Sequence, residues 1–347
     1  ALSLMGGTAV LFMQAPAQAE VQGSDVSGAI YSAPEDWTKS AQGPVTVFVS
    51  PEKDLSLAIV NIDSAPDARA AAAKAWAAYK PATDERAVRL VTPGAAGDGW
   101  DERAHISYET SPTEKMVVSA LVMRKDSEWT VMITDGADTT ANKRYAALSI
   151  MEQSLRPAGY KPETFAGKTA HRLTPERIEA LRQFVADSAR TLDAPGVGIA
   201  LIDQGKVVWE GGVGVRALGS PEPVDEHTKF MVASNTKGMA TLLLSTLADD
   251  GMLDWDTPLT SLYPSFRLGS DETTKSTLVR HLVCACTGLP RRDYAFVLAD
   301  AGAPATDTFR QLAESYTTSD FGELFQYNNL MASAAGYLGG SLAYPDM

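Results

Sequence analysis

The stretch from Ser234 to Ala248 constrains this chain more than any other, because it joins a polar start to a long apolar run. A serine and a lysine stand three positions apart, as Ser234-x-x-Lys237. At that spacing in a helix the two side chains lie on one face, a single turn apart. The residues that follow are apolar around most of the helix, which predicts a helix buried between other layers and ended by Gly251.

Ser234 and Lys237 are candidate catalytic residues. A serine hydroxyl is a weak nucleophile and needs an adjacent base. A lysine amine can act as that base where burial disfavours the charged form. The amino terminus of the helix adds positive potential where an oxyanion would develop. The alternative is an ordinary helix start, with Ser234 as the N-cap and an exposed lysine on the next turn.

The chain contains a second pair with the same spacing, Ser50-x-x-Lys53. This copy lies between two strand-like runs, residues 45–49 and 55–62, and no apolar helix follows it. It therefore predicts a hairpin turn and not a functional site.

Length and composition indicate a globular protein that can hold two domains. The chain has 347 residues, of which 45% are hydrophobic and 21% charged. The formal net charge is −13, which argues against nucleic acid or an anionic membrane surface as a partner. Beyond the first residues, no segment is long and apolar enough to cross a bilayer, so we expect no integral membrane segment.

The first nineteen residues are typical of the tail of a secretory signal peptide. An apolar core, residues 9–13, precedes the small-x-small pattern Ala17-x-Ala19, where cleavage would occur. No basic segment precedes the core, so we expect the sequence to start inside the signal. A transmembrane anchor is the alternative, but the apolar run is too short to span. The expected location is the periplasm or the cell exterior.

The two cysteines, Cys284 and Cys286, are separated by one residue. Cysteines this close rarely bridge, because the intervening backbone is too short for relaxed geometry, so we expect a fold without a disulfide. A metal site formed with His281 is the alternative, but the spacing matches no usual zinc pattern. We therefore expect neither a metal nor a cofactor.

Residues 20–160 are predicted to form a small α+β domain. No catalytic constellation occurs there, so we interpret it as an accessory or docking domain that could bind a protein partner. The expected strands span residues 45–49, 55–62, 103–110, 116–124 and 128–134, and the expected helices span 67–79 and 141–155.

Residues 161–172 are predicted to be a linker, rich in Pro, Gly and polar residues. A second domain, residues 173–347, begins with Thr174-Pro175, which is typical of an N-cap followed by the first helical residue. Two strands, residues 196–202 and 206–210, follow that helix and are joined by a tight turn.

Several motifs of the second domain occur together and in a fixed order. Two strands precede Ser234-x-x-Lys237; the turn Thr287-Gly-Leu-Pro, the motif Tyr327-x-Asn329 and a glycine-bearing helix come after it. The set resembles the class C β-lactamase and penicillin-recognising serine hydrolase family, which includes DD-peptidases and esterases. The resemblance covers roughly residues 172–347.

The resemblance implies an α+β fold (an α/β sandwich) in which helices pack on an antiparallel sheet. It implies that Ser234 is the acylated nucleophile, that Lys237 holds or takes its proton, that Tyr327 is the base or shares a proton with the lysine, and that Asn329 positions the substrate amide. The implied substrates are β-lactams, peptidoglycan-derived D-amino-acid peptides or small esters. The alternative is a non-catalytic, penicillin-binding-like protein that recognises peptidoglycan.

The sequence departs from the family pattern at two places. Residues 285–289 read Ala-Cys-Thr-Gly-Leu where the family usually has His-Thr-Ser-Gly-Leu. No Lys/His-Thr/Ser-Gly motif follows Asn329, although in the family this motif lies on a strand that completes the oxyanion hole. Losing one oxyanion donor typically costs about a hundred- to a thousand-fold in rate. We therefore expect a C-terminally incomplete hydrolase domain that is inactive alone.

Overall fold

The computed structural model describes residues 20–25, 27–81, 86–292, 304 and 306–345. The described chain divides into two compact units: one comprises residues up to Pro162 together with Lys237 onward, and the other is Glu163–Thr236. The predicted signal-peptide remnant, residues 1–19, lies outside the described residues. The predicted linker, residues 161–172, and the domain boundaries on either side of it stay predictions.

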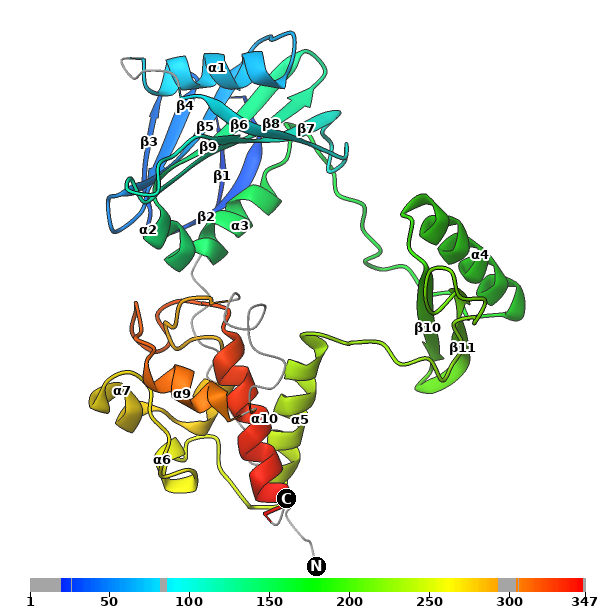
Figure 1. Ribbon diagram of the computed structural model, residues 1–347. Helices are drawn as coiled ribbons and strands as arrows, with labels where there is room; N and C mark the ends of the chain where they lie inside the picture. The colour runs from blue at the N-terminus through cyan, green and yellow to red at the C-terminus, as the bar shows by residue number, and fades with distance from the viewer. Residues whose placement is uncertain (1–19, 26, 82–85, 293–303, 305, 346–347) are drawn as a thin grey trace, which may run out of the picture. The chain divides into compact units, whose positions relative to one another are not determined.

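The amino-terminal part is built on a seven-stranded antiparallel sheet with the order β3-β4-β5-β9-β8-β7-β6 (Figure 1). A separate pair, β1 (Glu20–Ser24) and β2 (Ile30–Pro34), is also antiparallel. The seven strands are β3 (Thr38–Gln42), β4 (Val45–Val49), β5 (Leu55–Ile62), β6 (Val88–Gly94), β7 (Glu102–Tyr108), β8 (Met116–Lys125) and β9 (Glu128–Ala137).

The two faces of this sheet carry separate hydrophobic cores. Helix α1 (Ala68–Tyr79) covers one face and buries a stripe of small side chains, Ala68, Ala71, Ala72 and Ala75, at helical spacing. On the other face, β2 and α3 (Tyr145–Ser154) enclose the second core. The central strands β5, β8 and β9 are therefore buried on both sides, which explains their nearly continuous apolar sequence.

The helix predicted over residues 141–155 is wrong in detail, because two helices meet at Arg144. Helix α2 spans Asp138–Lys143 and α3 begins at Tyr145. The Arg144 side chain is only 4% exposed and forms ion pairs with Glu52 at 2.9 Å and Asp36 at 2.8 Å. This buried ionic cluster fixes the break.

The second serine–lysine pair lies in a turn, as predicted. Strands β4 and β5 pair in an antiparallel hairpin, and residues 50–54 connect them. Ser50 is buried, whereas Lys53 is exposed and has a positive φ of 65°. The two side chains therefore lie in different environments, which fits a structural turn.

In the unit Glu163–Thr236, one helix packs on a two-stranded hairpin. Helix α4 (Pro175–Thr191) begins as predicted, because the Thr174 hydroxyl accepts a hydrogen bond from the Arg177 N–H. It packs on β10 (Gly196–Asp203) and β11 (Lys206–Gly214), which are antiparallel. Large apolar side chains of this hairpin, such as Ile202 and Val207, stay exposed.

The carboxyl-terminal part is helical and has its own core. In Figure 1, α5 (Asn235–Asp249) and α10 (Asn329–Ala343) lie side by side. The contact is close, since a Cβ on Gly339 would lie 2.7 Å from Cδ2 of Leu243. The shorter helices are α6 (Leu259–Leu262), α7 (Asp271–Ser276), the 3-10 helix η1 (Val279–Leu282) and α9 (Asp307–Ala313).

Helix α5 is partly buried within its own unit. Leu244 and Leu247 are buried in the core, but Met239 and Leu242 on the same helix are largely exposed. Within its own unit and among the described residues, α10 and the neighbouring core cover one side of α5. The expectation of a helix buried between other layers stays a prediction.

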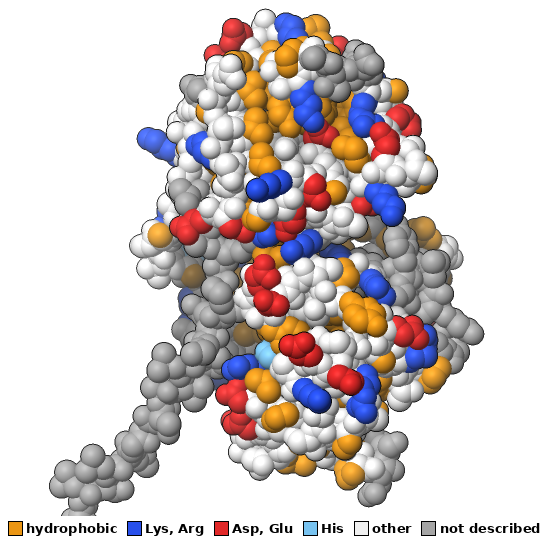
Figure 2. Space-filling model, turned by 90° about the vertical axis from the view of Figure 1, so that its left-hand side faces the viewer, with side chains coloured by type: hydrophobic (Ala, Val, Ile, Leu, Met, Phe, Trp, Pro, Cys, Tyr) orange, Lys and Arg blue, Asp and Glu red, His pale blue; other side chains and the backbone are white. Residues whose placement is uncertain are grey.

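Acidic and basic side chains are interspersed on the face shown in Figure 2, and neither sign gathers into a stripe. Within the described residues, no helix combines the length and the apolar character that spanning a bilayer requires.

Candidate active site

Three of the four predicted site residues meet where α5 and α10 begin. Lys237 lies in the first turn of α5, Asn329 is the first residue of α10, and Tyr327 precedes α10 by two positions. The Nζ atom of Lys237 donates a hydrogen bond to Oδ1 of Asn329 at 2.5 Å. The same ammonium group lies 4.6 Å from the centre of the Tyr327 ring. The tertiary fold thus joins two motifs that are distant in sequence.

A cavity of about 220 Å³ opens beside this cluster. None of its lining residues is acidic, and the polar ones are Lys237, Thr241, Cys284, Thr287, Tyr327 and Asn328. Most of the wall is apolar and comes from Ala240, Leu282, Val283, Ala285, Phe325 and Met331. Such a wall with a few convergent polar groups is typical of small-molecule sites.

Asn328 fixes the chain between the tyrosine and α10. Its Oδ1 accepts a hydrogen bond from the Met331 N–H at 3.0 Å and so caps the helix. Its Nδ2 donates to the carbonyl oxygen of Pro290 at 3.3 Å. The side chain is buried, so both contacts hold the start of α10 against the turn at residues 287–290.

Ser234 is exposed and lies immediately before α5, three positions from Lys237. Ala233, the residue before it, has a φ of 44°. A residue with a Cβ is disfavoured in this left-handed region, and such backbone is held only where the surroundings impose it. The hydroxyl of Ser234 therefore follows a constrained turn.

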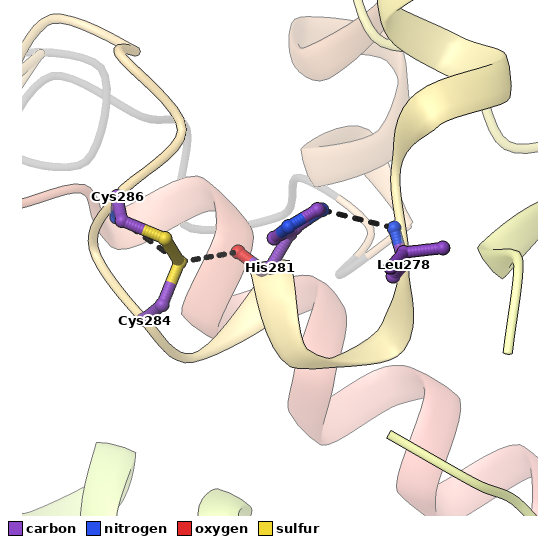
Figure 3. The surroundings of a disulfide bond; sticks show 4 residues. All are labelled: Leu278, His281, Cys284 and Cys286. Atoms are coloured by element: carbon purple, nitrogen blue, oxygen red, sulfur yellow. Dashed lines mark hydrogen bonds between the residues drawn. A yellow bond between two sulfur atoms is a disulfide. The ribbon is translucent and has the colours of Figure 1, made fainter. Parts of the chain in front are cut away.

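Cys284 and Cys286 form a disulfide, which corrects the prediction that they do not bridge. Figure 3 shows the bond between the two sulfurs. Their Cα atoms lie 5.1 Å apart, and the intervening residue, Ala285, has a φ of 51°. The left-handed conformation of Ala285 brings the two sulfurs together across one residue. The prediction was wrong because it assumed an ordinary backbone conformation between the two cysteines. Among the described residues, no group of His, Cys, Asp and Glu could hold a metal ion.

His281 caps the short helix beside the disulfide. Its Nδ1 accepts a hydrogen bond from the Leu278 N–H at 3.0 Å, as Figure 3 shows. Burial and the nearby Arg280 lower the pKa of His281 to about 4. The imidazole is therefore neutral at pH 7, with its proton on Nε2, and supports the wall of the cavity without charge.

Gly288 and Thr287 complete this wall. Gly288 has a φ of 69°, and a Cβ there would lie 2.3 Å from the carbonyl oxygen of Ser319. No other residue fits this close approach without moving the backbone. The Oγ1 atom of Thr287 is buried, and within the described structure it has no hydrogen-bond partner.

Two contributors to the site were missed from the sequence. The guanidinium carbon of Arg291 lies 4.9 Å from the centre of the Tyr327 ring, so a second cation contacts the tyrosine. Asn328 supplies the cap described above. The position of Asn328 just before an apolar run was an available N-cap signal, whereas no local pattern links Arg291 to Tyr327.

Residues 180–345 match the model of the Beta-lactamase family, which confirms the resemblance drawn from the motifs. The chain is 31% identical over 159 residues to the unguisins hydrolase ungD' of Aspergillus campestris, a match that covers 43% of this chain and 29% of that protein. It is 22% identical over 168 residues to protein flp of Staphylococcus aureus strain N315, covering 48% and 34% respectively. The chain thus spans about a third of the length of these curated relatives.

A solved structure similar to part of the chain is the solution structure of cyanobacterial PsbP (CyanoP) from Synechocystis sp. PCC 6803. It covers 45% of this chain and 98% of that chain, at 14% identity and a TM-score of 0.32.

Proposed function

We propose that the region predicted as residues 173–347, which matches the model of the Beta-lactamase family over residues 180–345, is a serine hydrolase that works through an acyl-enzyme. In this proposal Ser234 is the nucleophile, and Lys237 or Tyr327 accepts its proton and later returns it to the leaving group. Asn329 orients the amide or ester of the substrate. The relative named as a hydrolase supports hydrolytic chemistry in general.

The proposed reaction has two steps. The Ser234 hydroxyl attacks the substrate carbonyl carbon and forms a C–O bond, while its proton passes to Lys237 or Tyr327. The proton then goes to the leaving amine or alcohol as the scissile bond breaks. Water hydrolyses the resulting ester, releases the acid and restores the hydroxyl.

The observation that carries the proposal is the meeting of Lys237, Tyr327 and Asn329 beside one cavity. Chain connectivity limits the distance from Ser234 to Lys237 to at most about 11 Å between Cα atoms. The positive end of α5 follows the serine directly and would stabilise developing negative charge.

The cavity supports a small-molecule substrate. Its volume of about 220 Å³ and its largely apolar wall suit a compact acyl group. With Lys237 in the wall and no acidic lining residue, the cavity also tolerates an anionic substituent. We therefore propose β-lactams, D-amino-acid peptides or small esters as the substrate class.

We propose an oxidising location, the periplasm or the cell exterior. The Cys284–Cys286 disulfide supports it, because disulfides persist mainly in such compartments. The apolar segment and Ala17-x-Ala19 pattern in the sequence agree with secretion.

Labelling with a fluorophosphonate or a penicillin probe tests the proposal. In the whole protein we expect one label per chain, located at Ser234 by mass spectrometry and lost in Ser234→Ala. Ser50→Ala is the matched control, because it removes the serine of the other Ser-x-x-Lys pair, whose buried hydroxyl has no partner in the described structure.

Equal labelling of the protein and of Ser234→Ala would refute the assignment. Reversible binding of a peptidoglycan peptide that survives Ser234→Ala, without any covalent label, would favour a non-catalytic recognition protein.

A further inference from the structure

The disulfide-bonded turn at residues 284–286 is joined to the segment that carries Tyr327. The Ala285 carbonyl accepts a hydrogen bond from the Gln326 N–H at 2.8 Å. The Cys286 carbonyl accepts one from the Gly322 N–H, also at 2.8 Å. Gln326 directly precedes Tyr327, so a movement of the turn would also move the tyrosine, one residue away.

Ala285 adopts a backbone conformation that needs support. Its φ of 51° lies in the left-handed region, which a residue with a Cβ adopts only at an energetic cost. The disulfide closes over this one residue and restrains it (Figure 3). Without that restraint Ala285 gains access to the ordinary negative φ region, in which its carbonyl points elsewhere.

A small reductant can reach this bond through the cavity. Cys284 lines the cavity together with Lys237 and Tyr327 and is partly exposed, whereas Cys286 is only 8% exposed. Thiol–disulfide exchange requires an attacking thiolate to approach one sulfur. Because Cys284 is the more exposed of the two residues, we take its sulfur as the one attacked and Cys286 as the leaving thiolate.

We propose that the Cys284–Cys286 pair is a redox-modification site at which a small dithiol releases the Tyr327 segment from the cavity wall. A thiolate of the dithiol attacks the sulfur of Cys284 and breaks the disulfide, forming a mixed disulfide and the Cys286 thiolate. The second thiol of the reductant then displaces Cys284. Two electrons and two protons reach the protein, which gains two thiols, and the reductant leaves as a cyclic disulfide.

Hydrogen–deuterium exchange tests this proposal without depending on enzymatic activity. The protein is compared before and after treatment with dithiothreitol, and thiols are counted by alkylation and mass. We expect two new thiols and about fivefold or faster exchange of the amides of Gly322 and Gln326, because both lose their carbonyl partners. Peptides from β9 (Glu128–Ala137) serve as the internal control and should not change.

Two variants sharpen the result. The double variant Cys284→Ser, Cys286→Ser should show the fast exchange with or without dithiothreitol. Ala285→Gly adopts the left-handed conformation without the Cβ penalty, so reduction should accelerate exchange less than in the unchanged protein. If the double variant does not fold, the comparison of exchange rates between Ala285→Gly and the unchanged protein still tests the proposal.

The proposal is overturned if two thiols form and exchange at Gly322 and Gln326 stays the same. It is also overturned if native protein gains no thiols at millimolar dithiothreitol. A second readout rests on the proposed function: the rate of fluorophosphonate labelling at Ser234 should fall on reduction. Absence of labelling in both redox states would refute the hydrolase proposal alone, since the exchange measurement stands independently.

Discussion

The amine of Lys237 donates a 2.5 Å hydrogen bond to the side-chain oxygen of Asn329, a residue 92 positions further along the chain. Each partner lies in the first turn of its helix, so one bond sets the start of α5 against the start of α10. An intramolecular hydrogen bond typically contributes about 0.5–1.5 kcal/mol net. It therefore has enough strength to orient the lysine beside the cavity.

The adjacent asparagines at positions 328 and 329 should have separable roles. Asn329→Ala removes the partner of Lys237, and we expect the labelling rate at Ser234 to fall about tenfold or more while unfolding changes little. Asn328→Ala removes the N-cap of α10 and should cost about 1 kcal/mol of stability in urea unfolding. Identical losses of rate and stability in the two variants would show that the roles are not divided.

Arg291 should help to position Tyr327 through its contact with the ring. Exposed cation–π contacts contribute about 0.5–1 kcal/mol, so Arg291→Gln should slow labelling roughly two- to fivefold. Arg291→Lys keeps the charge and should recover part of the rate. Arg292→Gln is the matched control, because Arg292 is an exposed neighbour with the same charge. An equal loss in Arg292→Gln would point to net charge and not to the ring contact.

The partly buried His281 should make the carboxyl-terminal part less stable in mild acid. Its pKa in the fold is about 4, below the 6.5 of a free imidazole, so the unfolded chain binds the proton first. The stabilisation is complete above pH 6.5 and is lost as the pH falls from 6.5 towards 4. Urea unfolding at pH 7 and pH 4.5 should show a loss on the order of 2–3 kcal/mol that His281→Asn reduces.

Asparagine is the informative replacement at His281, because its carbonyl can still accept the Leu278 N–H but does not titrate. The other titrating groups are common to both proteins and cancel in the difference. The same acid sensitivity in His281→Asn would place its origin elsewhere.

The Glu52–Arg144 cluster should dominate the acid sensitivity of the amino-terminal sheet at lower pH. Burial opposes ionisation of Glu52, but hydrogen bonds from Arg144 and Lys143 outweigh it and lower its pKa to about 2. Its contribution is present above pH 4.5 and is lost as the pH falls towards 2. Glu52→Gln should flatten the pH dependence of unfolding between these values.

Arg144→Met tests the same cluster by removing its cation in place of a carboxylate. It removes the buried cation that Glu52 and Asp36 share, but Lys143 still pairs with Glu52 at 3.0 Å and Asp36 is 44% exposed. We therefore expect a loss of about 1.5–3 kcal/mol, the usual contribution of hydrogen bonds to a charged group. A loss well below 1 kcal/mol, measured by urea unfolding at pH 7, would show that the cluster contributes little.

The sequence predicts those helices and strands whose ends depend only on neighbouring residues. The Thr174-Pro175 start of α4, the hairpin of β4 and β5 and the tight turn between β10 and β11 all follow from caps, turns and alternation over a few residues. The Ser234-x-x-Lys237 and Tyr327-x-Asn329 motifs also indicated which segments meet at the cavity.

The remaining features depend on tertiary contacts. Strand β3, Thr-Lys-Ser-Ala-Gln, has no apolar pattern and forms because its backbone pairs with β4 at the sheet edge. The break between α2 and α3 depends on Arg144 finding carboxylates far away in sequence. The disulfide depends on the left-handed backbone of Ala285, which the residue type itself disfavours.

Most of the buried apolar side chains in the described residues belong to three clusters that share no residue. Two clusters lie on the faces of the amino-terminal sheet and one lies among the carboxyl-terminal helices. Cooperative melting requires a continuous apolar interior, so heat should not disrupt the helical cluster and the sheet in a single step. A calorimetric trace would then contain more than one endotherm. A single melting temperature would describe only the part of the protein that unfolds at the lowest temperature.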